Sequence, residues 1–477
     1  MSNDDRLATA GAGGGATRAL AGRAPGWWRK QPHENPRLID WLSRRAWVIA
    51  LTPPRRRAAL ALGALVAGYL HVLGLHAPWS DYRDYTALWA PSLVYLLLLG
   101  FIYLLFRAAV RYRELPAFVQ RRPQVSLHAV FWLLLIVVWT LHAPGWLAEA
   151  VMLTAVVLPY LLWRCGYMLM SGQRGKAAGT RFRDHLFYIW PVWGNTNTPL
   201  GKGHDYLAQT EARTPEGYAT SVLAGLNLLM LALLWRICME IMGAVVHADP
   251  WNRLLPYVGD WTLNIPRLKS LLAGDRDATL FVTWVSLYLE MIWDVLNLAA
   301  HGHFFVGLLR LAGFYVFRNT YKPLLAQTVV EFWNRYYYYF KELLTQFFFL
   351  PTYLRLNGKP RAMRIVMSIF AAAFVGNLYY HLIQSALLLA ADGAGLAQRF
   401  VPNAIYCFLL ATGIAVSMLR EQAHRGAAQQ PGARTAVHSV RRIAGVWTFF
   451  ALVSYWNNPA DVTLAERASF FLGMFGA

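Results

Sequence analysis

Residues 219–246 read ATSVLAGLNLLMLALLWRICMEIMGAVV, a run of 28 residues in which Arg236 and Glu240 are the only charged side chains. A helix needs about 20 mostly apolar residues to cross the hydrocarbon core of a bilayer. Every backbone polar group in that core must be satisfied, and a helix does this within a single segment. The run therefore predicts a membrane-spanning helix.

Eight further apolar runs make the chain polytopic. The expected spans are Ala219–Val246 together with Ala58–Leu73, Ala87–Phe106, Val125–His142, Trp146–Met168, Ala278–Ala300, Met363–Ala390, Phe400–Leu419 and Ile443–Tyr455. We therefore expect an all-α polytopic integral membrane protein with about nine transmembrane helices, in a range of about eight to eleven, plus re-entrant or interfacial helices.

Composition supports this class. Hydrophobic residues make up 57% and charged residues 15% of the 477 residues. Soluble domains carry about 25% charge, so a large soluble α/β enzyme is not expected. Three scattered cysteines give no disulfide framework and no metal-ligand spacing.

Basic residues gather in alternate loops. With the N-terminus in the cytoplasm, residues 1–57 place eleven Lys and Arg there, and residues 107–122 place five more. Such an excess is typical of cytoplasmic loops. The formal charge of +20 is thus explained by topology, and nucleic acid is not expected as a partner. The Ala/Arg-rich composition indicates a bacterial source, and hence the inner (cytoplasmic) membrane.

The N-terminal segment differs from the membrane domain. Residues 1–57 are basic and rich in Gly and Ala, and the multi-span domain covers residues 58–477. Arg37–Leu51 has the spacing of a short amphipathic helix that would turn Leu38, Trp41, Leu42, Val48 and Ile49 toward lipid. A plain basic tail is the alternative interpretation.

Two regions depart from simple spans. Residues 181–217 hold a short apolar piece followed by Pro191, Gly194 and Pro199, which is typical of a re-entrant or interfacial segment. Residues 304–356 are aromatic and apolar but studded with charges, which predicts tilted, interfacial or half-buried helices.

Polar groups inside the apolar runs are costly and mark candidate sites. They are Glu149, Glu240, Glu290, Asp294, Asn297, His301, His303 and His381. Glu290 and Asp294 share a helix face, where they either line a polar cavity or pair with arginines of residues 304–356. His381 is either a base shielded from water or a core histidine bonded to a tyrosine. In EFWNRYYYYFKE at 331–342, Asn334 and Arg335 either belong to an interfacial aromatic belt or supply donors to a substrate.

These residues belong to an ordered set of blocks that resembles the membrane-bound O-acyltransferase family, loosely its bacterial polysaccharide O-acetylase members. The resemblance covers about residues 180–420. Its blocks are Phe182–Gly194, like the family's aromatic-proline-glycine re-entrant segment; Asp294 through GLLRLAGF at 307–314, like its acidic helix and G-L-A-R-L-L-G; NTYKP at 319–323, like N-x-x-x-P; FWNRY at 332–336, like F-W-x-R-W; and GNLYYH at 376–381, like the late histidine of G-x-W-H-G. Tyr337 stands where many glycan-acetylating members have a second histidine.

The resemblance implies transfer of an acyl group from a thioester to a hydroxyl. His381 and Asn334 would be catalytic, and Arg335, Tyr337, Trp333, Asp294 and Glu290 would bind substrate. No bound cofactor and no metal is expected. Acyl-CoA or an acyl carrier protein would be the co-substrate, arriving from the cytoplasm. The helix that carries His381 is expected to start at the cytoplasmic face near Met363. At 1.5 Å per residue His381 lies about 27 Å along this helix, which favours an acceptor on the extracytoplasmic side of the membrane.

A secreted or cell-envelope glycan is the first expectation for the acceptor, and a lipid or lipid-linked molecule is the second. Envelope proteins are possible partners. Two readings without catalysis remain open. A polytopic chain with intramembrane carboxylates also fits a transporter or export subunit. A member of the family that has lost activity would scaffold a partner enzyme.

Topology is directly testable. A Leu115→Cys variant should not react with an impermeant thiol reagent added to intact cells, because five arginines flank this position and would otherwise have crossed the membrane. The same variant should react after the membrane is opened. Efficient labelling in intact cells would invert the proposed orientation.

Overall fold

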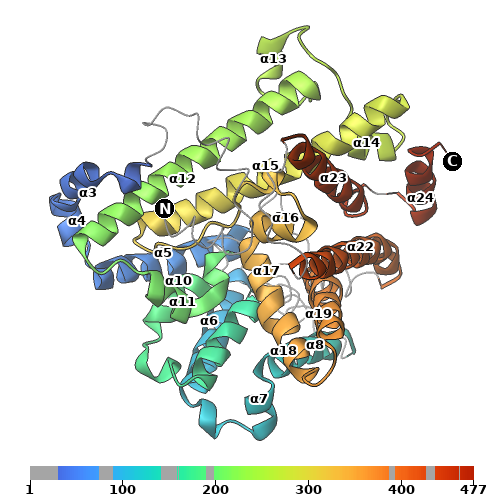
Figure 1. The fold of residues 1–477 in the computed structure, drawn as a ribbon. Coiled ribbons are helices and arrows are strands. Elements are labelled where there is room, and N and C mark those ends of the chain that lie inside the picture. The colour runs from blue at the N-terminus through green and yellow to red at the C-terminus, as the bar shows by residue number, and fades with distance from the viewer. Residues whose placement is uncertain are drawn as a thin grey trace.

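The computed structural model describes residues 31–74, 90–140, 158, 161–189, 198–385, 393–425, 436–460 and 462–476. Regular structure in these ranges is helical, and their one strand-like pairing is an isolated bridge between Glu211 and Phe314. Most of the expected span Trp146–Met168 lies outside the described residues. Within the described ranges the expectation of an all-α architecture is confirmed (Figure 1).

Six helices in the described ranges are long and apolar enough to cross a membrane. They are α5 (Pro53–Gly74), α6 (Ala90–Val110), α12 (Pro215–Ile241, continued by the π-helical η8, Met242–Val246), α15 (Leu280–Leu311), the composite helix of α19 (Arg361–Ile369), η11 (Phe370–Gly376) and α20 (Asn377–Gln384), and α22 (Gly393–Arg425). Two further expected spans are the helices α8 (Pro123–Thr140) and α23 (Ala436–Tyr455).

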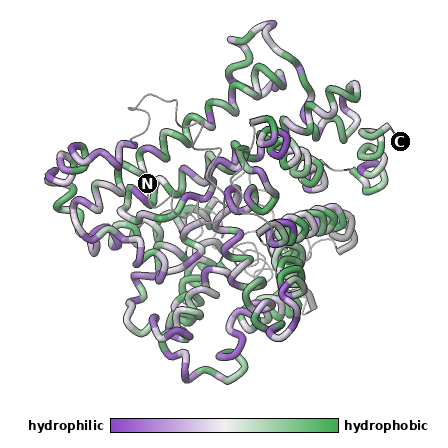
Figure 2. Tube along the Cα trace, viewed as in Figure 1, coloured by the Kyte–Doolittle hydropathy of each residue, from purple (hydrophilic) through white to green (hydrophobic). Residues whose placement is uncertain are grey.

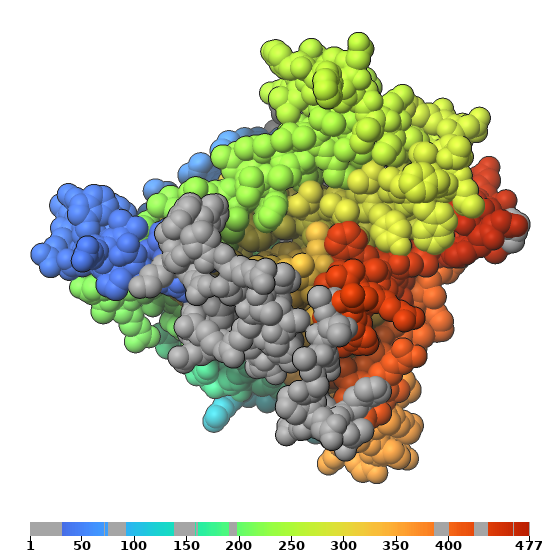
Figure 3. Space-filling view, turned by 45° about the horizontal axis from the view of Figure 1, so that its top comes forward, coloured from blue at the N-terminus to red at the C-terminus, as the bar shows by residue number. Residues whose placement is uncertain are grey.

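The remaining helices are short and join or cover the long ones. They are η2 (Pro32–Glu34), α3 (Pro36–Ser43), α4 (Ala46–Ala50), η4 (Tyr112–Glu114), α7 (Ala117–Arg121), η5 (Ala177–Gly179), α10 (Arg183–Ile189), η7 (Pro199–Lys202), α11 (Gly203–Thr210), α13 (Leu255–Val258), α14 (Leu268–Leu272), η9 (Pro323–Leu325), α16 (Val329–Tyr336), α17 (Tyr338–Leu344), η10 (Thr345–Phe349), α18 (Leu350–Arg355) and α24 (Leu464–Gly473). The segment around α13 projects from one end of the molecule (Figure 3).

Helices α12 and α15 run side by side and make the most extensive contact between two helices in the described structure (Figure 1). Glycines allow their close approach: a Cβ atom on Gly225 would lie 2.8 Å from the Gly307 carbonyl oxygen. The Ser221 hydroxyl donates to the Arg310 carbonyl oxygen at 2.7 Å, so a hydrogen bond joins the same contact. Gly307 and Arg310 belong to the GLLRLAGF block, which is therefore a packing element here.

The other face of α12 is apolar and open. Met230, Leu233, Leu234, Ile237 and Ile241 are all exposed along it. Figure 2 shows this green stretch continuing along the helix. An exposed apolar belt on a long helix is what lipid contact requires.

The N-terminal segment is only partly as expected. Two short helices, α3 and α4, replace the single amphipathic helix, and Leu42 and Val48 are buried against Tyr218 and Val222 of α12. The expectation that Leu42 and Val48 face lipid was wrong, because α12 offers them an apolar surface. Trp41 remains 54% exposed, as the amphipathic pattern predicted.

Residues 304–356 were expected to form tilted, interfacial or half-buried helices. Residues 304–311 instead continue the long helix α15, and short helices with half-buried side chains follow. After α15 the chain runs through an extended stretch to η9 and then forms α16, α17, η10 and α18. Pro191 and Gly194 of the expected re-entrant segment lie outside the described residues. Its apolar piece forms α10, where Phe187, Tyr188 and Ile189 are buried.

The contact between α12 and α15 gives a stability prediction. Gly225→Val should lower the free energy of unfolding by about 1–3 kcal/mol, because the added atoms meet backbone rather than flexible side chains. Gly100→Val on α6 is the matched control, since no atom lies within 4 Å of its Cβ position. Thermal unfolding of both variants in detergent checks this. Equal melting temperatures would show that the glycine contact is dispensable.

Candidate functional site

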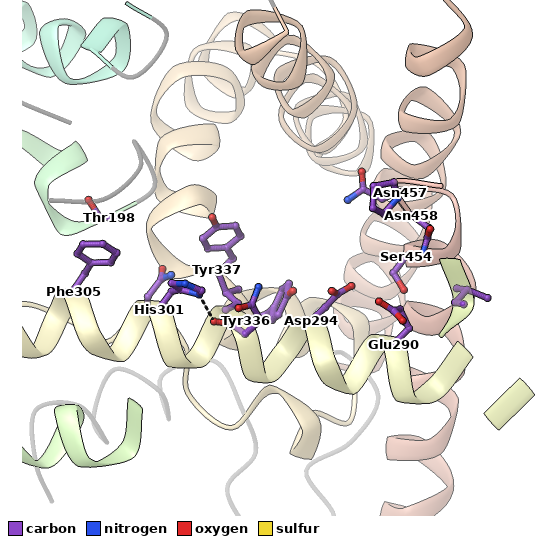
Figure 4. Close-up of a pocket in the computed structure, with 16 residues that line it drawn as sticks. Thr198, Glu290, Asp294, His301, Phe305, Tyr336, Tyr337, Ser454, Asn457 and Asn458 are labelled. Atoms are coloured by element: carbon purple, nitrogen blue, oxygen red, sulfur yellow. Dashed lines mark hydrogen bonds between the residues drawn. The ribbon is translucent and has the colours of Figure 1, made fainter. Parts of the chain in front are cut away.

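A cavity of about 460 Å³ lies between α15, the junction of α16 and α17, and the turn that follows α23 (Figure 4). Sixteen residues line it: Thr198, Leu268, Glu290, Asp294, Asn297, Leu298, His301, Gly302, Phe305, Asn319, Tyr336, Tyr337, Ser454, Asn457, Asn458 and Pro459. Most of its polar groups come from segments far apart in the sequence.

One wall of the cavity is a polar stripe on α15. Glu290, Asp294, Asn297 and His301 follow one another at intervals of four, three and four residues, which places them on one helix face. Figure 4 shows Glu290, Asp294 and His301 projecting from α15 on the cavity side. The His301 ring nitrogen Nδ1 lies 2.9 Å from the Asn297 carbonyl oxygen. The sequence had singled out these four residues, and the structure brings them to one site.

The two carboxylates of the stripe have different surroundings. Glu290 accepts two hydrogen bonds from the Arg267 guanidinium, at 3.1 and 2.9 Å, and that guanidinium stacks over Trp293. The expected partner from residues 304–356 was wrong, because Arg267 enters from the segment just before α14. Asp294 makes no hydrogen bond or ion pair with another described residue, so its carboxylate is available to a ligand.

The opposite wall was not expected from the sequence. Ser454 reaches the cavity from the last turn of α23, and Asn457 and Asn458 reach it from the turn that follows this helix. Arg467 of α24 is 2% exposed and holds this turn, donating to the carbonyl oxygens of Tyr455, Asn458 and Ala460 at 3.2, 3.1 and 2.9 Å. The sequence feature that could have indicated this wall is Asn457-Asn458-Pro459, directly after an apolar run.

The third wall is the break between α16 and α17. Asn319 accepts hydrogen bonds from two backbone N–H groups at this break. Its backbone carbonyl oxygen accepts from Tyr338 N–H at 2.9 Å, and its side-chain oxygen accepts from Tyr339 N–H at 3.2 Å. The NTYKP block therefore fixes the aromatic block in space. Burial raises the pKa of the Tyr336 and Tyr337 phenols well above the usual range, so both stay neutral and can donate.

The other residues of the aromatic block point elsewhere. Asn334 is exposed and makes no hydrogen bond with a described residue. Arg335 pairs with Glu331 one helical turn away, at 2.5 Å. Trp333 is buried and packs against Phe340. None of these three lines the cavity, whereas Tyr337, at the position of the family's second histidine, does.

His381 lies on α20 and is not part of the cavity lining. A layer of rings connects the two places: Tyr337 packs on Phe340 at 5.3 Å, and Phe340 packs on Tyr380 at 4.8 Å between ring centroids. The His381 ring makes no hydrogen bond with any described residue. The hydroxyl of the neighbouring Tyr379 is engaged instead by His128 and Trp132 of α8.

Four buried histidines in the described part of the chain have hydrogen-bond partners. His128 pairs with Tyr379, His185 with Tyr188 and Thr180, His247 with the Ile265 carbonyl, and His303 with the Ala299 carbonyl. A core histidine bonded to a tyrosine was one of the two interpretations of His381. The described residues supply no such bond.

The lining of the cavity indicates what it can bind. Its described lining residues include no lysine or arginine and offer two carboxylates, four side-chain amides, hydroxyls and phenols. These groups accept from and donate to hydroxyls, and they do not neutralise a phosphate. The cavity is therefore suited to a neutral, polyhydroxylated molecule. Among the residues that the structure describes, no cluster of three or more potential metal ligands occurs.

Comparison with known proteins gives no identification: no protein-family model matches the chain, and no curated protein matches it. The fold and the cavity define the class as an all-α membrane protein with a polar internal site.

The pairing of Glu290 with Arg267 is testable by a double-mutant cycle. Arg267→Met should destabilise the protein, because Glu290 would be left without its bidentate partner beside the cavity. Adding Glu290→Gln should recover part of the loss, with a coupling of about 0.5–3 kcal/mol in detergent unfolding. Strictly additive effects would mean that the pair contributes nothing.

Proposed function

We propose that this chain is a membrane O-acyltransferase that moves an acyl group from a thioester donor, acyl-CoA or an acyl carrier protein, to a hydroxyl of a cell-envelope or secreted glycan. The observation that carries the proposal is His381. It lies in a helix suited to crossing the membrane, and its ring has no partner among the described residues while the other buried histidines named above are bonded. A base must be free to accept a proton.

The chemistry needs few groups. His381 takes the proton of the acceptor hydroxyl as its oxygen attacks the thioester carbonyl carbon. A carbon–oxygen bond forms, the carbon–sulfur bond breaks, and the histidine returns the proton to the leaving thiolate. The products are an ester and a thiol. Neither a covalent acyl-enzyme nor a metal is required.

The cavity along α15 would hold the part of the acceptor that does not react. Its carboxylates, amides and phenols match the hydroxyls of a sugar, which favours a glycan over a lipid chain. Binding energy from remote parts of a substrate can position the reacting group. The reacting sugar would extend past Tyr337 toward His381. Asp294, Glu290 and Tyr337 then bind substrate, as the resemblance implies, while Asn334 and Arg335 have no contact with the cavity to support their roles.

The arrangement in the membrane completes the proposal. About nine spans with a cytoplasmic N-terminus in a bacterial inner membrane would put the basic loops on the side of the anionic donor. The donor thioester and the glycan would then approach His381 from opposite faces of the bilayer. A scaffold that has lost catalysis is the competing function, and the test below distinguishes the two.

His381→Gln should lower acyl transfer at least about 100-fold, because an amide retains hydrogen bonding but cannot take the proton. The assay is transfer of labelled acetyl from acetyl-CoA to envelope glycan by purified protein in lipid. The melting temperature should change little.

His128→Gln is the structural control for this experiment. Its ring bonds Tyr379 on the same helix, so this variant should lose stability rather than catalytic rate per folded molecule. An active His381→Gln variant, or one that is inactive only because it unfolds, would favour the scaffold.

A further inference from the structure

The side chain of Asn377 is buried in the core without hydrogen bonds. It is 1% exposed, and within the described part of the chain both its side-chain oxygen and its side-chain nitrogen lack a hydrogen-bond partner. Leaving buried polar groups unsatisfied costs about 1–3 kcal/mol per group, and such groups in a native protein call for a functional or strain explanation. A leucine, which has the same number of side-chain heavy atoms and the same branching, would carry no unsatisfied polar group there.

The place of Asn377 in the fold gives the explanation. Asn377 and His381 are four residues apart on α20, which puts their side chains on one helix face. Tyr380 next to them packs on Phe340 of α17, and Phe340 packs on Tyr337 at the cavity wall. The unpartnered amide and the unpartnered imidazole therefore stand together, beside the layer of rings that leads to the cavity.

The backbone directly before Asn377 is π-helical and sets the direction of this helix face. The π-helical segment η11 ends at Gly376, and π turns inside α-helices are frequent at functional sites. A Cβ atom on Gly376 would lie 2.7 Å from the ring of Phe348 in η10, itself a π-helical segment. Glycine at 376 thus lets two widened helical turns pack closely, directly before the amide.

We infer that Asn377 is a second catalytic residue, whose side-chain N–H group donates to the thioester carbonyl oxygen while His381 takes the acceptor's proton. This rests on the proposed function. Negative charge develops on that oxygen when the carbonyl carbon is attacked, and a preorganised donor stabilises it. In the state described here the amide is closed off by side chains, so the donor's acyl end must displace them to reach it. Proton and leaving group move as in the reaction above.

A leucine substitution distinguishes this role from a structural one. Asn377→Leu should keep or raise the melting temperature, because it replaces an unsatisfied amide by an apolar group of the same branched shape. Acyl transfer from acetyl-CoA should fall about 100-fold or more in kcat, the usual effect of losing one such donor. Stability and activity would thus move in opposite directions.

Asn252→Leu is the matched control. Asn252 is also buried, but its amide donates to the Glu240 carbonyl oxygen at 2.8 Å and its oxygen accepts from Leu254 N–H at 2.9 Å. This variant should lower the melting temperature and leave the rate per folded molecule unchanged.

The outcomes separate the two hypotheses. If Asn377→Leu retains wild-type kcat while His381→Gln is inactive, the role of Asn377 is overturned and the proposed function stands. If Asn377→Leu lowers the melting temperature as much as Asn252→Leu does, the amide is structural and the inference is also overturned. If His381→Gln remains active, the proposed function itself fails.

Discussion

Polar groups inside an apolar bundle must find partners there, because neither lipid nor packed side chains can replace water. Several buried arginines of this chain meet the constraint by donating to backbone carbonyl oxygens. Buried Arg164 donates to the carbonyl oxygens of Tyr188 and Ile189, which would otherwise end α10 unsatisfied. Buried Arg310 donates to the Val316 carbonyl oxygen and so fixes the chain as it leaves α15. These arginines hold loops in place, and the fold depends on them.

Three unpartnered groups bear on the proposed function. Among the described residues, Asp294 has no partner at the cavity, and His381 and Asn377 have none on their shared face of α20. Unsatisfied polar groups gathered on one helix face call for a reason, structural or functional. In our proposal that reason is a substrate, which supplies the missing hydrogen bonds. The unsatisfied amide of Asn377 then lowers the stability of the protein, which the melting temperature of Asn377→Leu measures.

Helix α15 shows how one element serves both stability and function. Gly307 on one face allows contact with α12, while the stripe from Glu290 to His301 on another face lines the cavity. Gly302 also lines the cavity and contacts Asn319, the residue that fixes the junction of α16 and α17. A Cβ atom on Gly302 would lie 3.0 Å from the Asn319 side chain. The position of Tyr337 at the cavity is therefore set by small residues on a neighbouring helix.

The sequence by itself determined the class of fold, because a long apolar run inside a bilayer can hydrogen-bond its own backbone N–H and C=O groups as a helix. It also determined the polar stripe, since intervals of four, three and four residues place Glu290, Asp294, Asn297 and His301 on one face of any helix. Only the tertiary structure decided what faces that stripe. Arg267, Asn457 and Asn458 come from loops, whose course no periodicity encodes.

The same division applies to the residues expected to be catalytic. The pattern FWNRYYYY could not show that Asn334 points outward and Tyr337 inward, because α16 ends at Tyr336 and Asn319 redirects the chain there. Nor could the sequence show that the amide of Asn377 lacks partners, since satisfaction of a buried group depends on every segment packed around it. Local spacing fixes which side chains share a face, and only packing fixes what that face meets.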